Sequence, residues 1–486
     1  MVVAIVVTSS GVRAGQARDE VTFSEQVAPI VFEKCATCHR PGEAAPFSLQ
    51  SYEDVRRRGT LIAAVVTSHQ MPPWKAESGD YAFRGDRRLS ANEIDVITRW
   101  VAAGMPEGDR ARLPKMPAFT EGWQLGTPDL IVRMSEPFEV PAYGPDIYRN
   151  FVLPLNLAED TWVKAIDFRP SARGVVHHSL FYADATGAAR ARDAADPKPG
   201  FDGSMGGFAG ARGGLQQLLM GRGAGAGAAS GAGASNATDL LAEQMRAASG
   251  LGGWALGALP RALPEGLAYF LPKKSDLVLS THFHSDGKVE KEASVVGLYF
   301  SKTPPTQAFT SLQLPPVFGV FEGLNIPPGE HYTLTDSWVL PVDVKAFNIF
   351  AHAHYLAREM VMTATFPDAT VHTLLSIKDW DFAWQEQYQF QSYVPLPKGT
   401  KLDVRITYDN SEANPRNPSH PPIQVSWGEQ STDEMGSMGI QVITDRPEDL
   451  AALEQAYARK VQMSALTKPG LRQFMSRRQQ AAPPER

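Results

Sequence analysis

Cysteine is nearly absent from this chain of 486 residues, which has only Cys35 and Cys38. Both belong to one short motif, so no network of disulfides can staple the fold, which must be stabilised by packed cores and bound metals. No apolar run approaches the length of about 18 residues that a membrane-spanning helix needs. The chain also lacks a block of basic residues, and its net charge of −6 gives no reason to expect a nucleic acid partner.

The two cysteines stand in the sequence Cys35-Ala36-Thr37-Cys38-His39. Cys-x-x-Cys-His is the attachment signature of a c-type haem, in which the thiols bond the porphyrin and the imidazole ligates iron. The alternatives are a redox dithiol or half of a zinc site. No second ligand pair follows at zinc-finger spacing, and His39 argues against a thioredoxin-like motif. The sequence therefore predicts one covalent haem c.

A haem iron needs a second axial ligand, and Met71 in the sequence Met71-Pro72-Pro73-Trp74 is our candidate. A thioether on a loop stiffened by prolines holds its position, and His/Met ligation raises the reduction potential of the iron. His69 is a rival ligand, and Met71 as a simple core residue is the third interpretation. With expected helices over Val21–Lys34 and after the capping box Ser90–Glu93, residues 18–115 resemble a small class I cytochrome c.

The ends of the chain differ from its middle. The apolar run Met1–Val7 and the small residues before Ala17 resemble the end of a secretory signal, although a charged start is missing. We therefore expect residues 1–17 to be a signal remnant and the protein to be periplasmic or secreted, because covalent haem of this type is attached outside the cytoplasm. Residues 446–486 should form a final helix, from Pro447 to about Met463 with Asp445 as its cap, and a tail.

Two stretches between these ends have the short strands and frequent turns of antiparallel sandwiches. We expect domains at residues 116–300 and 301–445, with a Gly/Ala-rich flexible insertion at 203–253 that includes a short helix at Thr238–Ala248. Strands are expected at the following residues: Asp129–Met134, Tyr148–Leu155, Thr161–Phe168, Ala346–Phe350, Met360–Phe366, Tyr388–Val394 and Leu402–Tyr408.

Six of the eleven histidines occur as three doublets in apolar, strand-like settings. The doublets are His177-His178, His282-Phe283-His284 and His352-Ala353-His354. Residues two apart share one face of a strand, so His352 and His354 can converge on one metal ion. Adjacent His177 and His178 can do so only at a strand end or a β-bulge. Imidazole with an occasional thioether favours copper over zinc. The alternative is that these doublets are ordinary surface or core histidines that bind no metal.

These clusters resemble, in their order, the copper type II ascorbate-dependent monooxygenases, the family of dopamine β-monooxygenase and peptidylglycine α-hydroxylating monooxygenase. The resemblance spans about residues 129–445 and is carried by these segments: Val175–Leu180, Trp254–Gly257, Pro264–Ala268, Leu279–His284, Ile326–Pro328, Ile349–His354, Tyr408–Asn410 and Ser431–Met435. It implies an electron-transfer copper held by His177, His178 and His282. It implies a second, catalytic copper held by His352, His354 and Met435, with His284 left as a supporting group.

Departures from the family concern its substrate clamp and its disulfides. The peptide-hydroxylating members bind a carboxylate with an arginine two residues before His-x-His, where this chain has Phe350. They use an asparagine and a tyrosine after the methionine, where this chain has Ser437 and Gly439. A peptide carboxylate is therefore not the expected substrate, and the pocket should be more apolar. The disulfides of the animal members are also missing.

Together these features predict a multidomain α plus all-β fold, an N-terminal α-helical cytochrome c domain followed by two antiparallel jelly-roll-like copper sandwiches. The expected function is copper-dependent hydroxylation of a C–H bond of a small organic substrate with O2. An external donor would supply electrons to the haem, and the haem would supply them to copper. The alternative is a non-catalytic electron-transfer or copper-handling protein.

Overall fold

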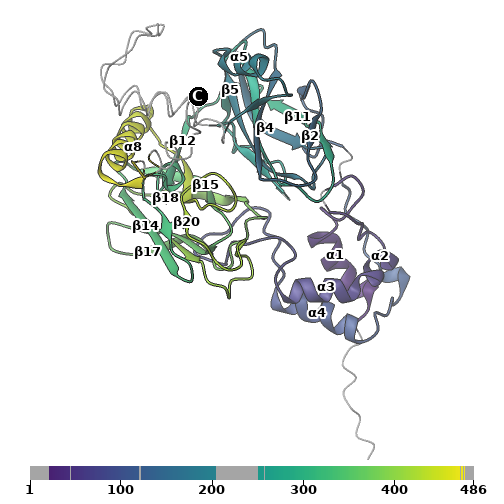
Figure 1. Cartoon of the computed structure of the whole chain (residues 1–486). Coiled ribbons are helices and arrows are strands. Elements are labelled where there is room, and N and C mark those ends of the chain that lie inside the picture. Colours follow the sequence, from purple (N-terminus) through teal and green to yellow (C-terminus); the bar gives the residue numbers. More distant parts are fainter. Residues whose placement is uncertain are drawn as a thin grey trace, which may run out of the picture. The chain divides into compact units, whose positions relative to one another are not determined.

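The computed structural model describes residues 21–43, 45–119, 122–203, 250–256, 258–470, 472, 473 and 476. The expected signal remnant, nearly all of the 203–253 insertion and its expected helix lie outside the described residues. The chain divides into two compact units (Figure 1). Unit 1 consists of Met1–Pro73 and Arg87–Phe119, and unit 2 of Trp74–Asp86 and Thr120–Arg486. Residues 74–86, which the sequence placed in the first domain, therefore belong to unit 2. The other expected domain boundaries stay predictions.

Unit 1 contains short helices around Phe23 and Trp100, whose rings are fully buried and 6.0 Å apart. The capping box at Ser90 is confirmed, because Ser90 Oγ accepts from the Glu93 N–H and the Glu93 carboxylate accepts from the Ser90 N–H. The helices are η1 (Phe23–Val27), α1 (Ala28–Lys34), α2 (Tyr52–Arg57), α3 (Gly59–Thr67), α4 (Ala91–Ala102) and η2 (Arg110–Arg112).

The helix expected over Val21–Lys34 is split in two. Phe23–Val27 forms a π-helical turn, and α1 starts afresh at Ala28 with Pro29 in its first turn. Proline has no N–H to continue the hydrogen bonding of a preceding turn but fits the first turn of a new helix. The apolar periodicity therefore marked the buried face correctly and missed the break.

The first half of unit 2, residues 122–300, buries one core between a five-stranded and a four-stranded antiparallel sheet. Phe151 and Phe283 come from the larger sheet, and Phe168 and Leu298 from the smaller. The larger sheet has the order β6-β3-β9-β5-β7, with bounds β6 (Phe201–Asp202), β3 (Ile147–Pro154), β9 (Asp276–Phe283), β5 (Val176–Asp184) and β7 (Gly253–Ala255). The smaller has the order β1-β11-β4-β8, with bounds β1 (Leu130–Arg133), β11 (Val295–Phe300), β4 (Thr161–Arg169) and β8 (Tyr269–Leu271). The described residues of this half also contain a two-stranded sheet, β2 (Phe138–Val140) with β10 (Glu290–Glu292), and the helix α5 (Ala188–Ala195).

The second half of unit 2, residues 301–473, has two four-stranded antiparallel sheets over a larger core. One sheet has the order β12-β21-β15-β18, with bounds β12 (Phe309–Leu314), β21 (Gly436–Ile443), β15 (Val344–Ala353) and β18 (Gln387–Leu396). The other has the order β14-β19-β16-β17, with bounds β14 (His331–Val339), β19 (Lys401–Asp409), β16 (Ala357–Thr365) and β17 (Val371–Ile377). The remaining elements are η3 (Val317–Gly319), and β13 (Asn325–Ile326) paired with β20 (Val425–Ser426).

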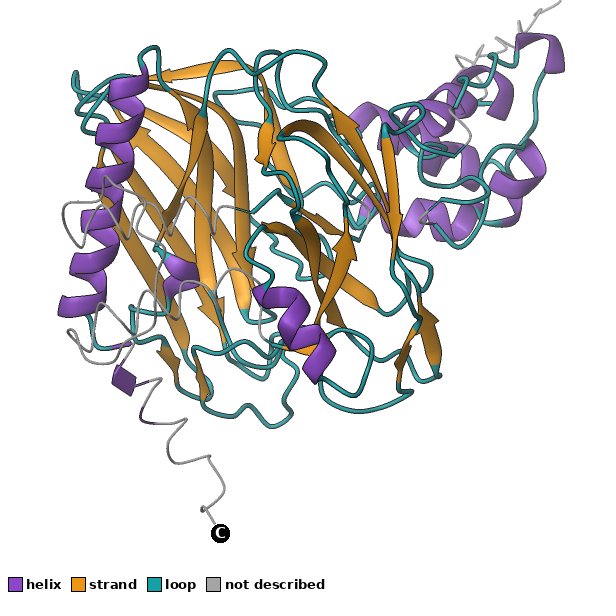
Figure 2. Cartoon of the chain, turned by 90° about the horizontal axis from the view of Figure 1, so that it is seen from above, coloured by secondary structure: helices purple, strands orange, loops and turns teal. Residues whose placement is uncertain are grey.

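The final helix α8 (Pro447–Thr467) lies beside the strands of this half (Figure 2). Its Tyr457 hydroxyl donates to the Gln313 carbonyl at 2.7 Å, and its Lys460 pairs with Asp336 at 2.8 Å. The expected cap Asp445 instead pairs with Lys345, and Arg446 occupies the N-cap. No helix in the described ranges is long and apolar enough to cross a membrane.

Residues 74–86 run along the second half and add to its core. Ala76 forms a β-bridge with Ile377, and Phe83 forms one with Phe390. Trp74 is buried, with its ring centroid 5.1 Å from that of Tyr388. Burial of these apolar side chains is the physical reason that the segment belongs to unit 2.

The predicted fold class, a helical cytochrome c domain followed by two jelly-roll-like copper sandwiches, is wrong. Among the described residues strand predominates, arranged as six small sheets of two to five strands (Figure 2). The described α-helices of unit 1 have only six to twelve residues, and no helical cytochrome domain is evident in its described residues. Local periodicity located individual strands well, and all seven expected strands overlap observed ones. It did not encode how these strands are divided among sheets, because that depends on long-range pairing.

Candidate metal centre

Three histidines of the first half come together at the start of β5 and the end of β9. His178 is paired with His282 across the two antiparallel strands, and the register shifts between Val176 and His178. The shift lets His177 and His178 face the same region although they are adjacent, as the sequence required of a β-bulge or strand end. One ligand atom of each of these three histidines lies within 4.8 Å of the others.

Neighbouring side chains hold this triad in place. The Tyr148 ring stacks on His282 with 4.3 Å between centroids and an angle of 8°. Asp146 Oδ2 lies 3.1 Å from His282 Nε2, but neither ring nitrogen of His282 makes an aligned hydrogen bond with a described residue. His284 is half exposed and contacts Asp146 at 2.8 Å, so it lies outside the triad. Burial acts to raise the pKa of Asp146, but contacts from His282, Ser431 and His284 lower it below its ordinary value.

The second-half histidines lie at the end of β15, with their side chains oriented by hydrogen bonds. His352 Nδ1 is 2.6 Å from Gln385 Oε1, and His354 Nδ1 is 3.1 Å from the Asp433 carbonyl oxygen. Because both partners are acceptors, each Nδ1 carries the proton and each Nε2 keeps its lone pair. His352 Nε2 is buried and has no hydrogen-bond partner among the described residues. This is the arrangement in which histidines bind metals.

Burial keeps these imidazoles neutral near pH 7. It lowers the pKa of His177 to about 3 and that of His352 to about 4. It also lowers the pKa values of His178 and His354 well below the ordinary value, and that of His282 to a lesser degree. A neutral imidazole offers its lone pair to a metal without first losing a proton.

Met435 directly precedes β21, whose Gly436 is paired with Ala353 and whose Ser437 is paired with His352. Paired residues of antiparallel strands share a face, as do residues two apart. Met435 therefore belongs to the face of Ser437 and His352. Its side chain is buried, and a Cβ on Gly436 would point the opposite way, toward Tyr408. Met435 also belongs to the hydrophobic core of this half, so its role as a copper ligand stays a prediction.

Glu434 joins the two segments that carry these residues. Its buried carboxylate accepts from the backbone N–H groups of His354 at 3.0 Å, Leu356 at 2.6 Å and Met435 at 3.2 Å. Burial raises the pKa of Glu434 to about 8, although these hydrogen bonds act to lower it. No role could be predicted for Glu434, Gln385 or Asp433, because the histidines that they contact are 33 to 80 residues away in the chain.

The two histidine sets adjoin one another within unit 2. Phe382 stacks on His177 with 4.2 Å between centroids and lies edge-on to His354 at 5.2 Å. The rings of His178 and His352 are 6.3 Å apart. A cavity of about 490 Å³ reaches these two histidines. The sequence suggested two sets of ligands, and the structure places histidines of both sets beside one aromatic ring. The ring centroids of His177, His282 and His354 lie within 6.3 Å of that of Phe382.

The substrate-clamp positions of the resembling family are occupied here by paired residues. Phe350 on β15 is the cross-strand partner of Gly439 on β21. A Cβ at Gly439 would come within 2.3 Å of the Phe350 ring, so the large ring and the missing side chain accommodate each other. Two of the three departures noted at the clamp positions, Phe350 and Gly439, are therefore explained by packing against each other, while Ser437 is paired with His352.

The Cys-x-x-Cys-His segment lies in unit 1 as a turn that continues from the end of α1. The backbone N–H of His39 donates to the Cys35 carbonyl at 2.9 Å, and both cysteines are free of disulfides. His39 Nδ1 lies 3.2 Å from the Phe47 carbonyl oxygen, which leaves Nε2 as the ring nitrogen with a lone pair. Burial raises the pKa of the Cys35 thiol to about 12. Met71 is half-buried in the loop after α3, and exposed His69 precedes it, so the second axial ligand stays a prediction.

No protein-family model matches the chain, and a search of curated proteins also finds no match. Solved structures with some likeness include the infectious bursal disease virus VP2 subviral particle, at 7% identity and a TM-score of 0.17, covering 66% of this chain and 73% of that one. Another is the T=1 particle derived from the same virus, at 8% identity and a TM-score of 0.14, covering 72% and 90%. Scores this low carry no argument about fold or function.

Proposed function

We propose that this chain is a copper-dependent monooxygenase that hydroxylates a C–H bond of a small organic molecule. The observation that carries the proposal is the close approach of two histidine sets, from each of which one member, His178 or His352, lines a cavity large enough for such a molecule. The reaction consumes the substrate, O2, two electrons and two protons, and yields the alcohol and water. Bound copper would supply the one-electron steps that O2 requires.

The donor set fits copper. His177, His178 and His282 would hold one ion, and the cluster of their ligand atoms supports this. His352, His354 and Met435 would hold the other, and the partnerless Nε2 of His352 supports that assignment. A soft thioether together with imidazole favours copper, and three protein ligands leave room for a small molecule.

The chain's own residues prepare this site in several ways. Gln385 and the Asp433 carbonyl fix the ring orientations of His352 and His354. Glu434 ties the backbone at His354 to that at Met435. Phe382 packs between the two sets and keeps water from the rings it covers.

We propose that electrons enter through a haem bonded to Cys35 and Cys38, with an external donor reducing it. The orientation of His39 supports this part of the proposal, because the Phe47 carbonyl holds its Nδ1 and leaves Nε2 available for iron. Covalent haem of this kind is attached outside the cytoplasm, so a periplasmic or secreted location belongs to the same proposal. A non-catalytic copper-handling or electron-transfer protein is the alternative, but such a protein has no need of a cavity beside its ligands.

Metal analysis and product analysis of the full-length protein test the proposed function together. We expect one haem and two copper ions per chain, and alcohol labelled with ¹⁸O when ¹⁸O2 is supplied with a reductant. Zinc in the active preparation, or a single copper after full reconstitution, would contradict the ligand assignment. Uptake of O2 without any labelled product across a substrate screen would favour the non-catalytic alternative.

Replacing Gln385 with leucine should weaken copper binding at the second-half site by about 10–100-fold, because supporting contacts to metal-binding histidines have effects of this size. Leucine has a similar volume but cannot accept the proton of His352 Nδ1. Competition with a chromophoric Cu(I) chelator measures the affinity. Gln391→Leu on an exposed position of β18 is the matched control. Equal affinities in the two variants would show that Gln385 does not position the ligand.

A further inference from the structure

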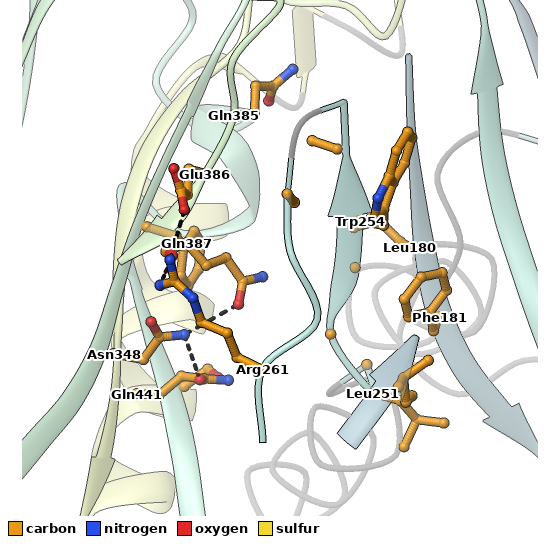
Figure 3. A pocket seen from close by; sticks show the side chains of 18 of the residues that line it. Leu180, Phe181, Leu251, Trp254, Arg261, Asn348, Gln385, Glu386, Gln387 and Gln441 are labelled. Atoms are coloured by element: carbon orange, nitrogen blue, oxygen red, sulfur yellow. Dashed lines mark hydrogen bonds and ion pairs between the residues drawn. The ribbon is translucent and has the colours of Figure 1, made fainter. Parts of the chain in front are cut away.

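The cavity beside the histidines has two chemically different walls (Figure 3). Side chains from β15, β18 and β21 form one wall, and residues of β5 and β7 with the segment around Leu251 form the other. His178 and His352 both line the cavity. A molecule bound in it therefore lies next to the groups assigned to copper.

Carboxamide groups cover the first wall. Asn348 Nδ2 donates to Gln387 Oε1 at 3.2 Å and to Gln441 Oε1 at 2.9 Å. The carbonyl oxygen of Asn348 accepts none of these bonds. A carboxamide offers two donors and an acceptor without carrying charge. The remaining carboxamide side chains of the lining are Gln313, Gln385 and Gln389.

The opposite wall is apolar and partly aromatic. Leu180, Phe181, Leu251 and Trp254 line the side opposite the labelled amides (Figure 3). Leu180 packs against the second-half core, and the other three belong to or pack against the first-half core. The Trp254 ring is itself held against Phe168, with 5.3 Å between centroids. This wall suits the flat face of a ring.

Charge in the described lining is balanced. Apart from the histidines, its charged side chains are Arg261 and Glu386, which pair with each other at 3.0 Å. Because Arg261 and Glu386 neutralise each other, neither offers an unpaired charge to a charged substrate. A buried ammonium or carboxylate would have to lose its hydration without gaining a counter-ion, which is costly.

We propose that the substrate is an uncharged ring compound with hydroxyl or carbonyl groups along one edge, bound between the amide wall and Trp254. This inference rests on the proposed function for its claim that the occupant is a substrate. The ring face would lie on the apolar wall, and its polar edge would exchange hydrogen bonds with Asn348 and Gln441. Amines and carboxylates of the same shape are excluded by the missing counter-charge.

Three probes of nearly equal shape test the charge requirement. They are 2-phenylethanol, which is neutral, 2-phenylethylamine, which is a cation, and phenylacetate, which is an anion. Calorimetry with the copper-free full-length protein avoids direct coordination of the amine to copper. We expect the alcohol to bind at least about tenfold more tightly than either charged probe. Equal or tighter binding of a charged probe, or no binding of the alcohol, would overturn the inference.

Charge substitutions locate the binding wall. Gln441→Glu keeps the oxygen that accepts from Asn348 and adds a negative charge, so binding of the amine should increase by about tenfold. Gln387→Glu is a second variant at an exposed position of the same wall, where folding tolerates a charge. Gln391→Glu makes the same change on β18 outside the cavity and should leave binding unchanged. If neither cavity variant changes the preference among probes, the amide wall is not the contact surface.

The outcomes separate this inference from the proposed function. Selective binding of the neutral probe without any hydroxylated product from the copper-loaded protein would remove the monooxygenase assignment and leave the pocket chemistry intact. Hydroxylation of a charged substrate in preference to its neutral analogue would overturn the proposed pocket chemistry and leave the monooxygenase assignment intact.

Discussion

Replacing Met435 with alanine is expected to reduce hydroxylation by more than about 100-fold, because the loss of a ligand should exceed the 10–100-fold effect of losing a supporting contact. The haem spectrum should not change, since Met435 belongs to unit 2. The reaction rate per folded protein, measured with ¹⁸O2 and mass spectrometry, is the decisive quantity. Loss of the buried side chain should also lower the free energy of unfolding by about 2–5 kcal/mol.

Met438→Ala is the matched control for this experiment. Met438 lies three residues further along, is fully buried in β21 and belongs to the core. Its replacement should have a stability cost in the same range of about 2–5 kcal/mol and preserve the rate per folded molecule. If both variants lose stability and both keep full activity when folded, Met435 is a packing residue and not a copper ligand.

Replacing His282 with alanine should leave the haem reduced when the reduced protein meets O2 and substrate. In the unaltered chain, haem oxidation should parallel product formation, because the fused haem is the proposed donor to the first-half copper. Attachment in one chain raises the effective concentration of donor at acceptor to about millimolar. Stopped-flow absorbance should show haem oxidation slowed by more than about 100-fold in the variant.

The control here is His284→Ala, which alters the same end of β9. His284 contacts Asp146 but lies outside the triad, and its side chain is half exposed. Haem oxidation should stay close to the normal rate in this variant. Rapid haem oxidation in the His282 variant, or ascorbate-driven turnover that is indifferent to loss of Cys35 and Cys38, would mean that the haem serves another partner.

Several features of the candidate site could be predicted because they are local. Spacing alone placed His352 and His354 on one strand face, and the adjacency of His177 and His178 required a bulge or strand end, which the register shift at β5 provides. The capping box at Ser90 and the positions of the expected strands were also determined by neighbouring residues. Short-range periodicity and side-chain hydrogen bonding carry this information in the sequence itself.

Only the tertiary structure decided which of these pieces meet. The division of strands into six small sheets, the attachment of residues 74–86 to unit 2, and the approach of His178 to His352 all depend on contacts between distant residues. Gln385 becomes the partner of His352, and Glu434 that of His354, only after those strands pair. The amide wall arises because Asn348 and Gln441 are placed on neighbouring strands by their register. Local patterns identify residues able to bind metal, but long-range strand register determines what surrounds them.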